Sequence, residues 1–148
     1  MKEINRIVVP VDFLEHTDKL IDYAVYMAEK LSAVPYFFHV VDFYTGTAIL
    51  DTSYFQVCVE HLLADVKTKM SHLLEDMSKR FPGCNGEVVT GEPVDKIIEF
   101  AQDKHSDLII ISTHGAKGLE RIMLGSVAER VLKRAHCPVL IMNPFKEQ

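Results

Sequence analysis

Short apolar runs recur along the chain at regular intervals and indicate β-strands. They span residues 7–11, 36–41, 87–90, 108–111 and 138–142. Most are rich in valine, isoleucine or phenylalanine, and runs that are apolar throughout are typical of strands buried on both faces of a parallel sheet. The weakest is 87–90, which lies between two glycines.

Between these runs, apolar residues recur at i, i+3, i+4 and i+7, which predicts amphipathic helices. The predicted helices span 17–31, 59–77, 93–101 and 126–135. We expect Thr17 and Ser126 to be N-caps and Pro93 to start the third helix. The apolar stripe of the 59–77 helix is predicted to be core, and residues 42–54 are predicted to be irregular.

Strands that alternate with helices imply right-handed crossovers and a twisted parallel sheet. The predicted fold class is therefore α/β: one doubly wound, five-stranded parallel sheet with helices on both faces. The chain has 148 residues, the usual size of one domain, so we expect residues 1–148 to form a single domain.

Composition and charge narrow the function classes. The net charge of −5 argues against nucleic acid as a partner, because such binding depends on clustered Lys and Arg. No apolar run is long enough to cross a membrane, and the first residues lack a signal peptide, so we expect a cytoplasmic protein. Three widely spaced cysteines suggest neither a disulfide framework nor a zinc site.

Polar residues follow several predicted strands at their carboxyl ends, where open α/β sheets bind ligands. Asp12 follows the first strand, and Ser112, Thr113, His114 and Gly115 follow the fourth. Gly125 and Ser126 then open a helix, whose N–H groups and dipole favour an anion such as phosphate.

The common nucleotide-binding motifs are absent from the sequence. There is no G-x-x-x-x-G-K-[ST] loop, and no G-x-G-x-x-G follows the first strand. The acidic cluster and acceptor aspartate of a receiver domain are missing as well. Structural alternatives to ligand binding remain open for single residues. Asp12 could cap the following turn, and His114 could hydrogen-bond the backbone. Lys117 and Arg121 could approach terminal phosphates or be no more than solvated loop charges.

The segment from Ser112 to Val131 closely resembles the signature of the universal stress protein family, whose ATP-binding branch carries G-x2-G-x9-G-[ST]. Gly115, Gly125 and Ser126 match with the spacing of nine kept, whereas Ser112 stands in place of the first glycine. The runs 7–13, 39–42 and 137–141 resemble further parts of the family, so the resemblance covers essentially the whole chain.

The resemblance implies a strand order of 3-2-1-4-5 and a site for ATP with Mg²⁺ or Mn²⁺. It puts Asp12 near the ribose and adenine, Val40 beside the adenine, and the glycine-containing segments at the phosphates. The complete candidate site consists of Pro10, Val11, Asp12, Val40, Ser112, Thr113, His114, Gly115, Gly125, Ser126 and Val127. No catalytic residue and no protein-only metal site is expected.

In relatives of this kind the fifth strand pairs with its copy in a second subunit, which implies a homodimer here. The predicted pairing strand consists of Val139, Leu140, Ile141 and Met142. The function expected is a dimeric regulatory module that signals its ATP occupancy in a stress response. A slow ATPase or autophosphorylating protein, and a family branch that acts by protein contacts without ATP, are the alternatives.

Overall fold

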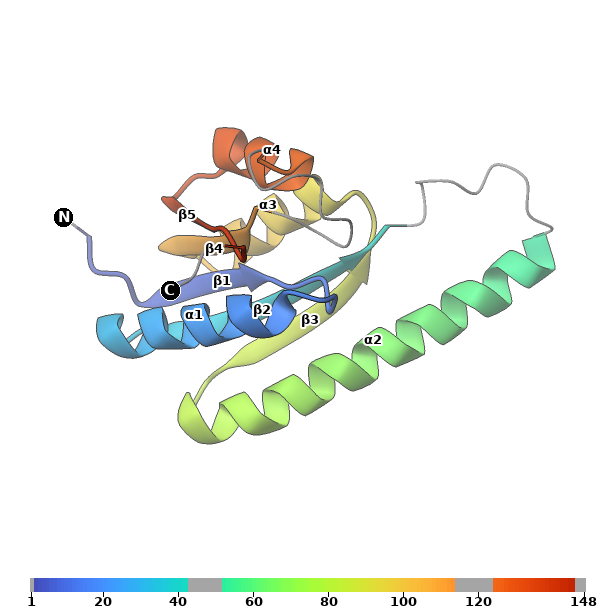
Figure 1. Ribbon diagram of the computed structural model, residues 1–148, viewed down its shortest axis with the longest axis horizontal. Helices are drawn as coiled ribbons and strands as arrows, with labels where there is room; N and C mark the ends of the chain where they lie inside the picture. The colour runs from blue at the N-terminus through green and yellow to red at the C-terminus, as the bar shows by residue number, and fades with distance from the viewer. Residues whose placement is uncertain (1, 43–51, 114–123, 146–148) are drawn as a thin grey trace.

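The computed structural model describes residues 2–42, 52–113 and 124–145. Its elements alternate along the chain as predicted (Figure 1). Their order is β1 (Arg6–Pro10), α1 (Thr17–Leu31), β2 (Val34–Val41), α2 (Thr52–Arg80), β3 (Asn85–Thr90), α3 (Pro93–Asp103), β4 (Leu108–Ser112), α4 (Ser126–Arg134) and β5 (Val139–Met142). All strand pairs are parallel, and the sheet order β3-β2-β1-β4-β5 confirms the expected topology.

The strands begin and end slightly away from their predicted limits because pairing, not apolar content, sets those limits. β1 begins one residue early, at Arg6, because Arg6 pairs with Val34. β2 begins early as well and includes Val34 and Pro35. β3 begins at Asn85, opposite Tyr36. Polar residues at strand ends thus join the sheet because the neighbouring strand offers backbone partners.

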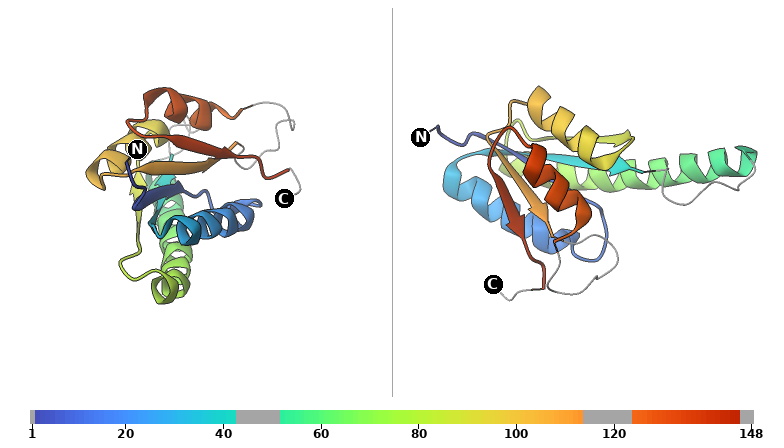
Figure 2. Two further views of the ribbon diagram at one scale, coloured as in Figure 1. Left: turned by 90° about the vertical axis from the view of Figure 1, so that its left-hand side faces the viewer. Right: turned by 90° about the horizontal axis from the view of Figure 1, so that it is seen from above.

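A hydrophobic core lies on each face of the sheet, since successive strand side chains point to opposite faces. On β1, Ile7 and Val9 pack into one cluster and Val8 into the other, and all three have no exposed surface. α1 and α2 cover the first face and α3 and α4 the second (Figure 2). The prediction of helices on both faces is confirmed.

Two predicted helix caps are wrong by one residue. α1 begins at Thr17 with His16 as its N-cap, and α4 begins at Ser126 with Gly125 as its N-cap. The Thr17 hydroxyl instead bonds backward into the turn after β1. Threonine and serine hydroxyls make both capping and first-turn bonds, so residue type alone does not locate the boundary.

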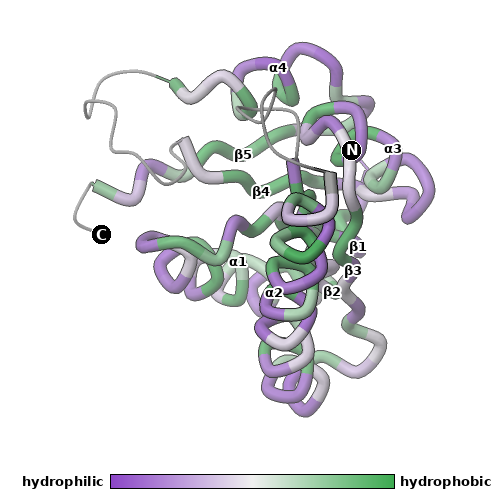
Figure 3. The backbone as a smooth tube through the Cα atoms, turned by 90° about the vertical axis from the view of Figure 1, so that its right-hand side faces the viewer, coloured by the Kyte–Doolittle hydropathy of each residue, from purple (hydrophilic) through white to green (hydrophobic). Residues whose placement is uncertain are grey.

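The predicted core stripe is wrong for the first half of α2. Val66 and Met70 are buried, but Leu62 is 45% exposed, and Val59 and Leu63 are only partly buried. The N-terminal half of α2 extends past the end of the sheet (Figure 1), and hydrophobic and hydrophilic residues alternate along its tube (Figure 3). Helical periodicity reveals an apolar face but not how far the sheet beneath it reaches. Neither α2 nor another helix in the described ranges is long and apolar enough to cross a membrane.

Asp107 joins the beginnings of β1 and β4. Its Oδ2 accepts hydrogen bonds from the backbone N–H groups of Asn5 (3.0 Å) and Arg6 (3.1 Å), and its Oδ1 lies 2.8 Å from Nζ of Lys2. The ion pair with Lys2 and these backbone donors hold the pKa of the carboxyl below its usual value. The carboxylate therefore fastens the N-terminal segment to the amino-terminal edge of the sheet, opposite the candidate site.

Candidate functional site

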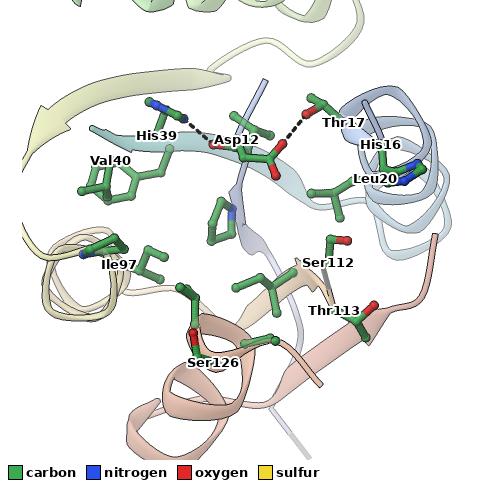
Figure 4. A pocket seen from close by; sticks show the side chains of 18 of the residues that line it. Asp12, His16, Thr17, Leu20, His39, Val40, Ile97, Ser112, Thr113 and Ser126 are labelled. Atoms are coloured by element: carbon green, nitrogen blue, oxygen red, sulfur yellow. Dashed lines mark hydrogen bonds between the residues drawn. The ribbon is translucent and has the colours of Figure 1, made fainter. Parts of the chain in front are cut away.

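A pocket of about 700 Å³ opens at the carboxyl ends of β1, β2 and β4 (Figure 4). All of the predicted site residues that fall within the described ranges line it: Pro10, Val11, Asp12, Val40, Ser112, Thr113, Gly125, Ser126 and Val127. His114 and Gly115, like Lys117 and Arg121, lie outside the described residues. A pocket of this size is in the range of small-molecule sites.

Gly125 brings the backbone before α4 into close contact with the end of β4. Its N–H donates to the carbonyl oxygen of Thr113 at 2.8 Å. A Cβ at position 125 would overlap that same oxygen, although φ is an ordinary −59°. Glycine is therefore required here for space rather than for a left-handed conformation.

The N-terminus of α4 faces the pocket with unused backbone donors. The first intrahelical bond runs from the N–H of Glu129 to the carbonyl of Gly125, and no side chain caps this end among the described residues. The N–H groups of Ser126, Val127 and Ala128 thus have no partner within the helix. Such an end attracts an anion through both its hydrogen bonds and its dipole.

One acidic side chain, Glu129, lines the pocket in this first turn of α4. Its carboxylate is 2.7 Å from Nζ of Lys133, one turn along the helix. The bond to Lys133 lowers the pKa of Glu129, so the carboxylate is charged at neutral pH and its charge is partly offset by the lysine.

Asp12 lies in the turn that connects β1 to α1. Its Oδ1 accepts hydrogen bonds from the backbone N–H of Leu14 (3.0 Å) and the hydroxyl of Thr17 (2.7 Å). The other carboxylate oxygen faces the middle of the pocket (Figure 4). Asp12 thus stabilises its turn, as the simpler interpretation expects, and still presents an acceptor to the pocket.

The same turn contains Phe13, whose φ of 57° is uncommon for an aromatic residue. Its ring packs against His39 at a centroid distance of 5.4 Å. Left-handed conformations of bulky residues are costly and cluster at functional sites. The turn that presents Asp12 is therefore held by tertiary packing rather than by local preference.

His39 lines the pocket but was not among the predicted site residues. Its Nδ1 is 2.7 Å from the carbonyl oxygen of Val11, and a carbonyl only accepts, so Nδ1 carries the proton. Burial lowers the pKa of His39 despite the opposing effects of that carbonyl and of Asp12. The neutral imidazole thus fixes the end of β1. A polar residue inside an apolar strand was the only signal in the sequence.

The apolar walls of the pocket were missed as well. Pro93 and Ile97 of α3 line one side and Leu20 of α1 lines another. In the sequence, Leu20 and Ile97 belong to the apolar stripes of their helices and Pro93 marks a helix start. Nothing in the sequence distinguishes an apolar residue that faces a pocket from one that faces the core.

Ion pairs hold α3 and α4 together beside the pocket. Arg130 Nη1 is 2.8 Å from Glu92 Oε1, and Arg134 Nη1 is 2.6 Å from Asp95 Oδ1. The other carboxylate oxygen of Glu92 accepts the N–H of Asp95 and so caps α3. These pairs are exposed and contribute modestly to stability, but they orient the helix ends. In the described ranges, no cluster of three His, Cys, Asp or Glu side chains is arranged to hold a metal ion.

Several relatives match nearly the whole chain, among them two universal stress proteins. Universal stress protein MJ0531 of Methanocaldococcus jannaschii is 33% identical over 143 residues, which cover 97% of this chain and 84% of the relative. Universal stress protein YxiE of Bacillus subtilis is 29% identical over 150 residues, covering 94% and 99% of the two chains.

Solved structures share the fold at lower identity. Universal stress protein UspA from Lactobacillus plantarum superposes with a TM-score of 0.81 at 23% identity, covering 96% of this chain and 99% of that one. A universal stress protein in complex with cAMP gives 0.62 at 20% (97% and 99% covered), and one from Archaeoglobus fulgidus in complex with dAMP gives 0.57 at 23% (95% and 98% covered).

The model of the Universal stress protein family matches residues 3–143. This match includes every strand and helix of the fold and every described residue of the pocket. The chain therefore belongs to the universal stress protein family.

Proposed function

We propose that this chain binds ATP in the pocket and acts as a regulatory module that signals its occupancy in a stress response. The observation that carries the proposal is the N-terminus of α4, which opens into the pocket with the N–H groups of Ser126, Val127 and Ala128 unused by the helix. Backbone donors in this arrangement suit a polyphosphate chain. The family members in complex with cAMP and dAMP, both adenine nucleotides, support the choice of base.

In this proposal the adenine lies between Val40 and the apolar side chains of Pro93 and Ile97. A flat heterocycle gains most from such walls, because they bury its faces away from water. The inward oxygen of Asp12 accepts hydrogen bonds from the ribose hydroxyls. His114 and Gly115 stay in the proposal as residues of the phosphate loop.

Mg²⁺ or Mn²⁺ enters the proposal with the nucleotide. Mg²⁺ in nucleotide sites usually keeps several waters and is held by phosphates with one or two protein oxygens. Ser126 and Thr113 line the pocket, and a hydroxyl is a hard oxygen donor of the kind that Mg²⁺ accepts.

The test is equilibrium titration of the purified chain with ATP, with and without Mg²⁺, and with GTP for comparison. We expect Ser126→Ala to weaken ATP binding by about two- to tenfold, the contribution of one hydrogen bond. Ser71→Ala, on an exposed position of α2, is the matched control and leaves binding unchanged. If millimolar ATP does not bind the natural chain, the proposal is wrong. Release of inorganic phosphate at a steady rate would instead indicate the ATPase alternative.

The proposal also includes a cytoplasmic homodimer of the 148-residue domain, formed through β5. β5 is the last strand of the sheet order, beside β4. Its residues Val139, Leu140 and Ile141 are only partly buried, which suits addition of a second sheet. We expect Leu140→Lys to shift sedimentation from dimer to monomer while the circular dichroism spectrum is retained. A natural chain that sediments as a monomer at all concentrations would refute the dimer.

A further inference from the structure

Directly after β5 the chain packs against the beginning of α1. Pro144 is fully buried, although it lies only a few residues from the C-terminus. Its carbonyl oxygen accepts a hydrogen bond from Nζ of Lys19, on the first turns of α1, at 3.0 Å. The N–H of Phe145 donates to Oδ1 of Asn143 at 3.0 Å and closes a tight turn. We refer to residues 143–145 as the C-terminal turn.

The C-terminal turn also contacts a residue of the pocket. The ring of Phe145 packs edge-on against His16, with centroids 4.7 Å apart and planes at 73°. His16 lines the pocket and is the N-cap of α1. The next residue, Thr17, donates to Asp12 at 2.7 Å. The first turn of α1 is therefore held by the C-terminal turn on one side and orients Asp12 on the other.

A second connection runs through Thr113. Its N–H donates to the carbonyl of Met142, the last residue of β5, at 2.9 Å. Its own carbonyl accepts the N–H of Gly125 at 2.8 Å. The backbone of Thr113 thus connects the two elements: its N–H bonds the end of β5 and its carbonyl bonds the residue before α4. Both ends of the pocket, at Asp12 and at α4, are tied to the end of the edge strand.

We propose that the C-terminal turn and Lys19 couple the pocket to β5, so that ATP binding and self-association strengthen each other. This inference rests on the proposed function. A second chain paired with β5 restrains Met142 and the C-terminal turn, and through Lys19 and His16 it restrains the turn that presents Asp12. ATP then binds a site that is already ordered and loses less conformational freedom. By linkage, ATP tightens the dimer by the same factor.

Lys19 is a positioning residue in this proposal, because it acts on the pocket through α1 and the C-terminal turn. Lys19→Met keeps most of the alkyl chain and removes the donor, and Lys19→Arg restores a donor. Lys30→Met is the matched control on the same helix, since Lys30 is exposed and lies over the ring of Tyr26, away from the C-terminal turn. Phe145→Leu tests the contact with His16 independently.

The experiment measures the dimer dissociation constant by sedimentation with and without saturating Mg·ATP, alongside ATP titrations of each variant. We expect ATP to tighten the natural dimer about fivefold or more, the lower end of measured couplings. The ratio should fall clearly below that of the natural chain in Lys19→Met and Phe145→Leu, because only the connection through Thr113 is left whole, and it should remain unchanged in Lys19→Arg and Lys30→Met. A purely structural role for Lys19 would change stability but leave the ratio intact.

Separate results would overturn the two proposals. A natural chain that does not bind ATP in the titration refutes the proposed function and, with it, the coupling. A natural chain that binds ATP but whose dimer constant is unchanged by ATP refutes the coupling alone. The same holds if the ratio of Lys19→Met equals that of the natural chain, or if the chain remains monomeric.

Discussion

Replacing Gly125 by alanine tests the proposed phosphate-binding end of the pocket most directly. The new Cβ would overlap the carbonyl oxygen of Thr113, which also accepts the N–H of Gly125. Relief of the overlap breaks that hydrogen bond, at about 0.5–1.5 kcal/mol, and strains a tightly packed turn, at about 1–3 kcal/mol. We therefore expect Gly125→Ala to lower the free energy of unfolding by about 2–4 kcal/mol and the Tm by roughly 5–15 °C.

ATP affinity should fall further than this loss of stability alone explains. The N–H groups of Ser126 and Val127 move with the turn, and one lost charge-assisted hydrogen bond already corresponds to about tenfold in affinity. We expect a loss of about tenfold or more, measured by titration at a temperature where the variant is fully folded. The dissociation constant then reports the site rather than the folded fraction.

Gly83→Ala is the matched control for Gly125→Ala. Gly83 has a φ of +90° and open space around it, so alanine there strains the backbone without a clash. It lies between α2 and β3, at the opposite edge of the sheet, so we expect reduced stability with unchanged ATP affinity. Natural ATP affinity or a natural Tm in Gly125→Ala would refute the steric role of Gly125 at this end of the pocket.

Three further measurements test the structure away from the pocket. Met70 is 4% exposed, so Met70→Ala should lower the free energy of unfolding in urea by about 2–5 kcal/mol. Leu62 is 45% exposed on the same helix, so Leu62→Ala should change it by about 0.5 kcal/mol or less. Equal losses would refute the conclusion that the first half of α2 lies beyond the core. Asp107→Asn should cost about 1–3 kcal/mol at pH 7. The pKa of Asp107 is lowered in the folded chain, so this contribution is present above the unfolded pKa of about 3.9 and is lost as the pH falls through the folded value. The stabilities of the natural chain and the variant should therefore converge once the pH is below that folded value. Burial raises the pKa of Cys84 to about 11 and also raises that of Cys137, so a thiol reagent at pH 8 should modify only the exposed Cys58 rapidly, and a second fast thiol would contradict these environments.

The fold was largely predictable because the strands other than β3 are distinct apolar runs and each helix has a clear period. The strand order was not readable from those runs, since an apolar strand does not specify its neighbours, and it came from the family resemblance. The sequence also did not show how much of α2 packs on the sheet. Leu62 and Val66 occupy equivalent positions in the pattern, yet only Val66 lies over the sheet.

The candidate site divides in a similar way. Asp12 follows a strand and Gly125 directly precedes a helix, and at such element ends the residue type indicates a ligand site. His39 and Ile97 lie inside regular elements, where their roles depend on side-chain direction and on what faces them. The role of Gly125 itself was only partly foreseen. The sequence suggested a glycine at a phosphate loop, whereas the steric reason, the carbonyl of Thr113, required three-dimensional packing.

The overhang of α2 has a consequence for the timescale of local opening. Helices of fewer than about 12–15 residues are marginal in water without tertiary support, and the first half of α2 has only such a length free of the sheet. Its amide protons should therefore exchange with solvent through fraying, far faster than those around Met70, which open only with the core. One continuous helix should thus contain a fast-exchanging and a slow-exchanging part. The residue at which the exchange rate changes marks the limit of the part of the chain that unfolds cooperatively.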